Sequence, residues 1–207
     1  MTFNMCWQNA LNEVVLRLCA DVKSPRAAVV GIGSSIHGDD AAGVMIVRAL
    51  KQNAVGGERL LVINASIALE NVFGVLQRFD PDLVLIIDAA QMGLKPGNVR
   101  CIDPQNATGF SFSTHTLPLQ ILCDYVATVI GSQVAILGIQ PADVSFGGAR
   151  SPLVKFSLAA MLPVLVEILS PVLQPDAELN VFEDCYMNDQ SNGSFNHCLS
   201  AMQRSIA

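Results

Sequence analysis

The sequence contains few charged residues. Only 14% of its 207 residues are Asp, Glu, Lys or Arg, whereas 51% are apolar, and about 25% charged residues is usual for a soluble protein. This composition excludes disorder over most of the chain, because enough apolar side chains are present to build a large core. The length fits one domain of ordinary size, so we predict a single domain over residues 1–207.

Positive charge is the scarcer sign. The chain has 12 Lys and Arg against 18 Asp and Glu, which leaves a formal net charge of −6, and it has no basic cluster. Nucleic acids and anionic membrane surfaces bind through lysine and arginine side chains that displace counterions. We therefore expect neither a nucleic acid nor a membrane as a partner.

Paired cysteines and targeting signals are also absent. None of the six cysteines forms a C-x-x-C pair, and the first residues lack the charged and apolar regions of a signal peptide. The segment 153–173 is apolar and long enough to cross a membrane, but Lys155, Pro163, Glu167 and Pro171 interrupt it. We predict a reduced, cytoplasmic protein without a membrane-spanning helix.

Apolar runs alternate with amphipathic segments along the chain. Residues 27–33 form a continuous apolar run that ends in glycine, which is typical of a buried parallel strand. Further strands are predicted over 60–63, 82–88 and 133–139, an edge strand of possible antiparallel direction over 98–103, and helices from about residue 40 and over 68–78, 117–130 and 152–169. This order predicts a three-layer α/β fold, with a mostly parallel twisted sheet of about five strands and helices on both faces.

Two segments lie outside this alternating core, which we place at residues 26–170. Residues 1–22 contain an apolar stripe, Leu11, Val14, Val15 and Leu18, that predicts an extra N-terminal helix. Residues 171–207 are polar and acidic, and we interpret them as a solvated tail.

Most standard catalytic motifs are missing. Gly31-Ile-Gly33 begins like the dinucleotide motif G-x-G-x-x-G, but the third glycine is absent. Asp39 and Asp40 also follow it, where they would repel a pyrophosphate. The chain has no G-x-S-x-G, no H-E-x-x-H and no P-loop. These absences argue against a dinucleotide enzyme, a standard serine hydrolase and a zincin.

Three side chains remain that combine into a plausible site. Asp40, Asp88 and His115 follow predicted strands, and ligands of open α/β sheets bind beyond the carboxyl ends of the strands. Two carboxylates and one imidazole suit a divalent ion such as nickel or zinc. Alternatives stay open for each residue: a helix cap for Asp40, a turn-forming acid for Asp88 and a surface histidine for His115.

The same residues carry a family resemblance. Four segments, 30–43 (VGIGSSIHGDDAAG), 87–97 (IDAAQMGLKPG), 113–119 (STHTLPL) and 137–141 (LGIQP), resemble the hydrogenase maturation endopeptidases. The branch that acts on hydrogenase 3 type enzymes is the most similar, because of the Asp-Ala-x-x-Met-Gly-Leu-x-Pro-Gly string. The resemblance covers residues 27 to 170.

The resemblance implies a cytoplasmic endopeptidase. Such an enzyme removes a C-terminal extension from the nickel-loaded precursor of a nickel-iron hydrogenase large subunit, which would be the partner of this chain. By resemblance, Asp40, Asp88 and His115 bind the metal, and the same three are the candidates for catalytic groups. The nickel would be supplied by the substrate, although zinc or another divalent ion could occupy the site.

Two positions depart from the family pattern. Ser34 stands where the family has asparagine, and Asn64-Ala-Ser66 stands where related sequences have Asp-Gly-Gly. We predict that Ser34 and Asn64 contact the substrate. Because Asn64 replaces a carboxylate, a noncatalytic, nickel-dependent module that binds the precursor as a chaperone is the alternative function, and an unrelated small-molecule hydrolase on the same sheet is a third.

Overall fold

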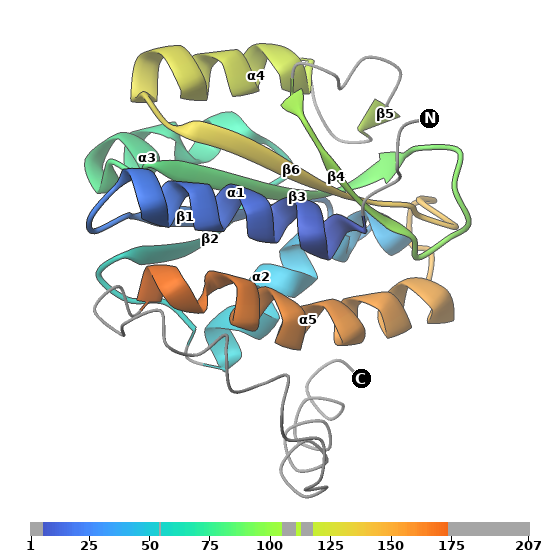
Figure 1. The fold of residues 1–207 in the computed structure, drawn as a ribbon. Coiled ribbons are helices and arrows are strands. Elements are labelled where there is room, and N and C mark those ends of the chain that lie inside the picture. Colours follow the sequence, from blue (N-terminus) through green and yellow to red (C-terminus); the bar gives the residue numbers. More distant parts are fainter. Residues whose placement is uncertain (1–5, 54, 105–110, 113–117, 174–207) are drawn as a thin grey trace, which may run out of the picture.

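The structure is a computed structural model, and it describes residues 6–53, 55–104, 111–112 and 118–173. Strands and helices alternate as the sequence predicts (Figure 1). The elements are α1 Trp7–Asp21, β1 Ala27–Ile32, the 3₁₀ turn η1 Gly38–Ala41, α2 Ala42–Gln52, β2 Leu60–Ser66, the 3₁₀ turn η2 Leu69–Val72, α3 Phe73–Phe79, β3 Leu83–Gln91, β4 Val99–Ile102, β5 Ser111–Phe112, α4 Leu119–Tyr125, the π-helical turn η4 Val126–Ile130, β6 Gln133–Ile139 and α5 Pro152–Leu173.

The main sheet has the strand order β2-β1-β3-β6-β4. The first four strands are parallel, and β4 runs antiparallel to β6, with Val99 opposite Ile139. The short strand β5 pairs with β3. The prediction of about five mostly parallel strands, with an antiparallel edge strand, is therefore confirmed. All four parallel strands end at one edge of the sheet, here called the carboxyl edge.

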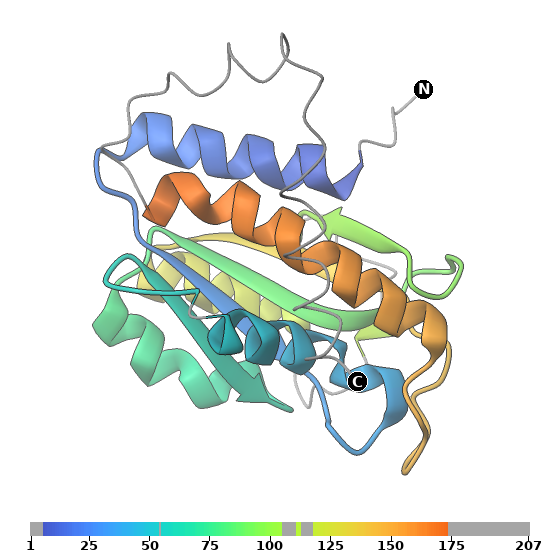
Figure 2. The same cartoon turned by 90° about the horizontal axis from the view of Figure 1, so that it is seen from below.

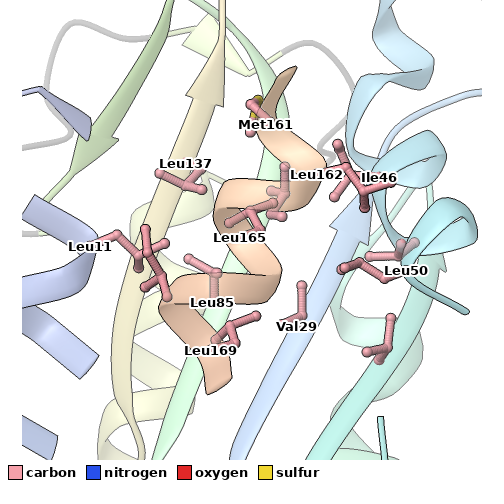
Figure 3. Packing of buried hydrophobic residues seen from close by; sticks show 14 of the residues in the cluster. Leu11, Val29, Ile46, Leu50, Leu85, Leu137, Met161, Leu162, Leu165 and Leu169 are labelled. Atoms are coloured by element: carbon pink, nitrogen blue, oxygen red, sulfur yellow. The ribbon is translucent and has the colours of Figure 1, made fainter. Parts of the chain in front are cut away.

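Helices cover both faces of the sheet. One apolar cluster joins α1, α2 and α5 to the sheet, and a second joins α3 and α4 to the opposite face. Figure 2 shows α1 and α5 side by side above the sheet. In the first cluster Leu165 and Leu169 of α5 pack over Leu85 and Leu137 (Figure 3). Because both faces are covered, the central strands are apolar along almost their whole length.

Helix α5 is long and apolar enough to cross a membrane by length and composition. In this fold it lies against the sheet and α1, with eight of its side chains buried, among them Leu158 and Leu165. It runs through Pro163 and Pro171 to Leu173, past the predicted end at residue 169 and into the segment predicted as tail. Packing along the helix compensates for the prolines. The predicted helix already contained Pro163, and only its continuation through Pro171 was not expected.

Other helix boundaries differ in detail. The helix expected from residue 40 begins as the 3₁₀ turn η1 and becomes α-helical at Ala42, and the helix expected over 68–78 divides into η2 and α3 in the same way. Tight 3₁₀ turns are common at helix ends. The predicted N-terminal helix is present as α1.

Candidate functional site

The loop after β1 holds the first carboxylate. Gly33 has a φ of +138°, and a Cβ at this position would collide with the backbone carbonyl of Asp40. Glycine therefore lets the chain fold back on itself, so that the Ser34 N–H donates to Oδ2 of Asp40 at 2.7 Å. Asp40 is 1% exposed, and this contact holds its carboxylate at the carboxyl edge.

The second carboxylate lies on the next strand. Asp88 is inside β3 and fully buried, and one of its oxygens accepts the N–H of Ala89 at 2.8 Å. Gly43, in the first turn of α2, lies so close to β3 that a Cβ would overlap the carbonyl oxygen of Ile87. This contact seats the turn that contains Asp40 beside the segment of β3 that contains Asp88.

The positions of the two acids differ from the simplest alternatives. The N-cap of α2 is Ala41 rather than Asp40, and Asp88 lies inside a strand rather than in a turn. Both carboxylates have further interactions in addition to the bonds above. Asp40, in the turn after β1, and Asp88, in the adjacent strand β3, are both buried. Carboxylate oxygens of this kind are suitable donors for a divalent cation.

His115 lies outside the described residues, so its part in the site stays a prediction. Within the described ranges, no three His, Cys, Asp or Glu side chains form a metal-binding group. Helix α4, which follows His115 in the sequence, packs on the same face of the sheet as Ile86, two residues before Asp88. The alternation of side chains along a strand turns Asp88 toward that face as well.

Asp39 has different hydrogen-bond partners from its neighbour Asp40. Its carboxylate accepts three backbone N–H groups from the loop between β6 and α5: Ala142 at 2.9 Å, Asp143 at 3.1 Å and Ser151 at 2.6 Å. Its own N–H donates to the carbonyl of Asp143 at 2.8 Å. Asp39 therefore ties the loop after β1 to the loop after β6. The sequence offered only the weak signal of two adjacent acids.

Gln140 is a second buried side chain that joins two segments. The sequence analysis included it only as part of the segment 137–141. Its side-chain oxygen accepts the N–H groups of Met92 at 2.8 Å and Leu94 at 3.2 Å, and its amide nitrogen donates to the side chain of Gln91 at 2.8 Å. These bonds attach the turn after β3 to the end of β6. Its position in the Leu137–Pro141 motif was the available signal.

The two predicted substrate contacts have different surroundings. Ser34 is 6% exposed and its hydroxyl hydrogen-bonds Nδ1 of His37 at 2.7 Å, so the side chain is engaged within the loop. Asn64 is exposed on β2, and its side-chain oxygen accepts the Ser66 N–H at 2.8 Å. The end of β2 is joined to the loop after β1, because the Gly33 N–H donates to the Ser66 carbonyl at 2.8 Å. Asn64 thus presents its amide near the carboxyl edge.

A pocket of about 400 Å³ opens between α1, β4 and α5, away from Asp40 and Asp88. Trp7, Val99 and Phe156 help to line this hollow. These elements cover the face opposite to that of Asp88. The hollow is therefore separate from the paired carboxylates.

The half-buried Cys101 and the buried Cys123 do not provide a reactive thiolate. Burial, with a smaller effect of Asp103, raises the pKa of Cys101 to about 11, and burial, with a smaller effect of Asp124, raises that of Cys123 to about 12. Both thiols stay protonated at neutral pH, and a thiol is a poor nucleophile. Neither suits a cysteine-protease mechanism.

Known proteins resemble this chain in sequence and in fold. A family model described as Hydrogenase maturation protease matches residues 44–168, which include Asp88 and begin shortly after Asp40. A hydrogenase maturation protease of Methanocaldococcus jannaschii is 34% identical over 150 residues, covering 70% of this chain and 88% of that protein. The Hydrogenase 3 maturation protease of Escherichia coli K12 is 40% identical over 116 residues, covering 56% and 72%.

The fold comparison agrees. The crystal structure of the NiFe hydrogenase maturation protease HycI from Thermococcus kodakarensis superposes with a TM-score of 0.65 at 33% identity, covering 70% of this chain and 93% of that one. The relatives thus span most of the α/β core described above.

Proposed function

Because this chain belongs to the hydrogenase maturation proteases, we propose that it removes the C-terminal extension from the nickel-loaded precursor of a nickel-iron hydrogenase large subunit. The observation that carries the proposal is the two buried carboxylates, Asp40 in the turn after β1 and Asp88 in the adjacent parallel strand β3. This is where an open α/β sheet binds its ligands.

In this proposal the nickel arrives with the substrate. Asp40 and Asp88 supply oxygen ligands, and His115 supplies an imidazole nitrogen, a donor set that suits a borderline divalent ion. Bound nickel is a Lewis acid that polarises a nearby carbonyl. The residues of this chain select the loaded precursor and orient its peptide bond, and a precursor without nickel lacks the ion that they recognise. Ser34 supports Asp40 through its N–H.

We place the reaction in the cytoplasm. The four cysteines in the described part of the chain, Cys6, Cys19, Cys101 and Cys123, are free. Free thiols suit a reducing compartment.

The test is a mass measurement on two substrates. Purified protein is incubated with the nickel-loaded and the nickel-free large-subunit precursor, and the mass of each product is recorded. We expect loss of a short C-terminal peptide from the nickel-loaded form only. Asp124→Asn, which alters an exposed acid on α4, is the control and should cleave like the wild type. Cleavage of both precursors at equal rates would overturn the nickel requirement.

A second function rests on Asn64. This chain presents a neutral, exposed amide at Asn64, where the family pattern that it resembles has a carboxylate. A module that binds the precursor without cutting it is therefore the competing hypothesis. Binding of the nickel-loaded precursor with no change of its mass would favour that hypothesis.

A further inference from the structure

Large apolar side chains gather on the surface around the carboxyl edge. In the part of the chain that the structure describes, seven large apolar residues are more than half exposed. Five of them follow the ends of parallel strands, and we call these five the apolar rim: Ile36, Ile67, Phe146, Leu153 and Phe156. The other two, Ile121 and Val129, lie on α4 and its π-helical extension η4. Single exposed apolar residues are ordinary, whereas a cluster marks an interaction surface.

Hydrogen bonds and one ring contact link the segments that carry Ile36, Phe146 and Ile67. The Gly147 N–H donates to the Ile36 carbonyl at 2.8 Å, and the ring of Phe146 meets that of His37 edge-on at 5.5 Å. In Figure 2 the loop before α5 (orange) lies beside the loop after β1 (blue). Ile67 follows Ser66, whose carbonyl accepts the Gly33 N–H.

The remaining rim residues lie farther along, on α5, where Phe156 also lines the hollow between α1, β4 and α5. Leu153 and Phe156 lie three residues apart on its first turns, and are therefore on one side of the helix. Ser151, just before this helix, donates its N–H to Asp39. The three N–H bonds that Asp39 accepts hold these loops in place before any partner arrives, and a preordered surface loses less entropy on binding.

We propose that the apolar rim, centred on Ile36 and Phe146, docks the large-subunit precursor as a folded protein; this inference rests on the proposed function. Ile36 belongs to the same loop as Asp40. A protein that delivers nickel to Asp40 approaches this loop, which Phe146 and Gly147 adjoin. The partner surface that fits is an apolar patch next to the peptide to be cut, since Phe146 is 78% and Ile36 58% exposed. Docking at the rim provides affinity for the precursor, while Asp40 and Asp88 bind the nickel beside the peptide bond that is cut.

The experiment compares Phe146→Ala with Ile121→Ser, a control of similar character on α4 that is 54% exposed. Binding of the nickel-loaded precursor is measured by surface plasmon resonance, and cleavage kinetics are measured separately. We expect Phe146→Ala to raise Kd and KM about tenfold or more, as truncation of an interface anchor does. It should leave kcat at saturating precursor nearly unchanged, and Ile121→Ser should change neither. Ile36→Ser is the second rim variant, and the melting temperature of each variant verifies its fold.

The outcomes separate the two proposals. If the wild type binds and cuts the precursor and both rim variants do so with unchanged Kd and KM, the docking role is wrong and the proposed function stands. If the wild type neither binds nor cuts it, the proposed function is wrong, and the rim loses its proposed partner. If Phe146→Ala instead abolishes a dimer of the wild type seen by sedimentation, the rim is a contact between copies of this chain.

Discussion

Polar side chains are buried in the loop after β1 but exposed at the end of the neighbouring strand β2. In the loop, Ser34, Asp39 and Asp40 are almost completely buried, and each makes a hydrogen bond of 3.1 Å or less. At the end of β2, Asn64 is exposed and bonds only locally to Ser66 among the contacts described. A substitution that removes hydrogen bonds of these buried side chains therefore costs stability, whereas a substitution at Asn64 leaves the fold intact and can change the chemistry.

The largest effect on stability is expected from Asp39→Asn. An amide cannot accept all three N–H groups that the carboxylate accepts, and it brings its own N–H donors toward them. We expect the free energy of unfolding to fall by about 3 kcal/mol, since hydrogen bonds to charged groups contribute about 1.5–3 kcal/mol each. Urea unfolding measures the change, with Asp124→Asn as the exposed control. Equal stability of the two variants would show that the loops do not depend on Asp39.

Asp40→Asn should damage activity more than stability. In the proposed site it removes the charge that binds nickel, and we expect cleavage of the nickel-loaded precursor to slow about 100-fold. Its effect on unfolding should be smaller than that of Asp39→Asn, because the substituted amide keeps an oxygen that can accept the Ser34 N–H. Single-turnover cleavage and urea unfolding of the same preparation give both numbers. Unchanged cleavage would remove Asp40 from the site.

Asn64→Asp alters only the exposed end of β2 and leaves the buried loop after β1 unchanged. Stability should stay within about 0.5 kcal/mol of the wild type, as is usual for surface substitutions. If the amide is a working variant of the family carboxylate, turnover should change by less than about threefold, that is, by under about 0.7 kcal/mol in activation free energy. A large gain in turnover would show instead that Asn64 impairs the enzyme and would favour the noncatalytic hypothesis.

The smallest effect concerns buried groups with no proposed function. Burial raises the pKa of Cys101 and Cys123 to about 11 and about 12 from 9.0, so the folded protein favours the neutral thiols. The stabilisation is complete below pH 9 and is lost as the pH rises toward the folded values, because the unfolded thiols ionise first. At pH 8 iodoacetamide should modify the exposed Cys6 well before these two, as peptide mass spectrometry can show. Equal rates in the native protein would contradict their burial.

Apolar periodicity predicted most of the fold. Strand β6 begins and ends at the predicted residues, and β1 and β3 differ from their predictions by only a few residues, because completely buried strands leave continuous apolar runs. Helix ends were predicted less well. Neither the extension of α5 to Leu173 nor the 3₁₀ start of α2 follows from local pattern, since packing against the sheet decides where a helix stops.

The sequence by itself determined the α/β class, the order of strands and helices and the residue types that follow the strands, because hydrophobic alternation and the parallel order leave few topologies. The separate tasks of Asp39 and Asp40 were decided only by the tertiary structure. Adjacent carboxylates are equivalent in a sequence, and it is the approach of the loop after β6, at residues far along the chain, that engages Asp39 and leaves Asp40 beside β3. Long-range contacts of this kind have no local signal, so the position of Phe146 beside the loop of Ile36 was also decided only by the folded chain.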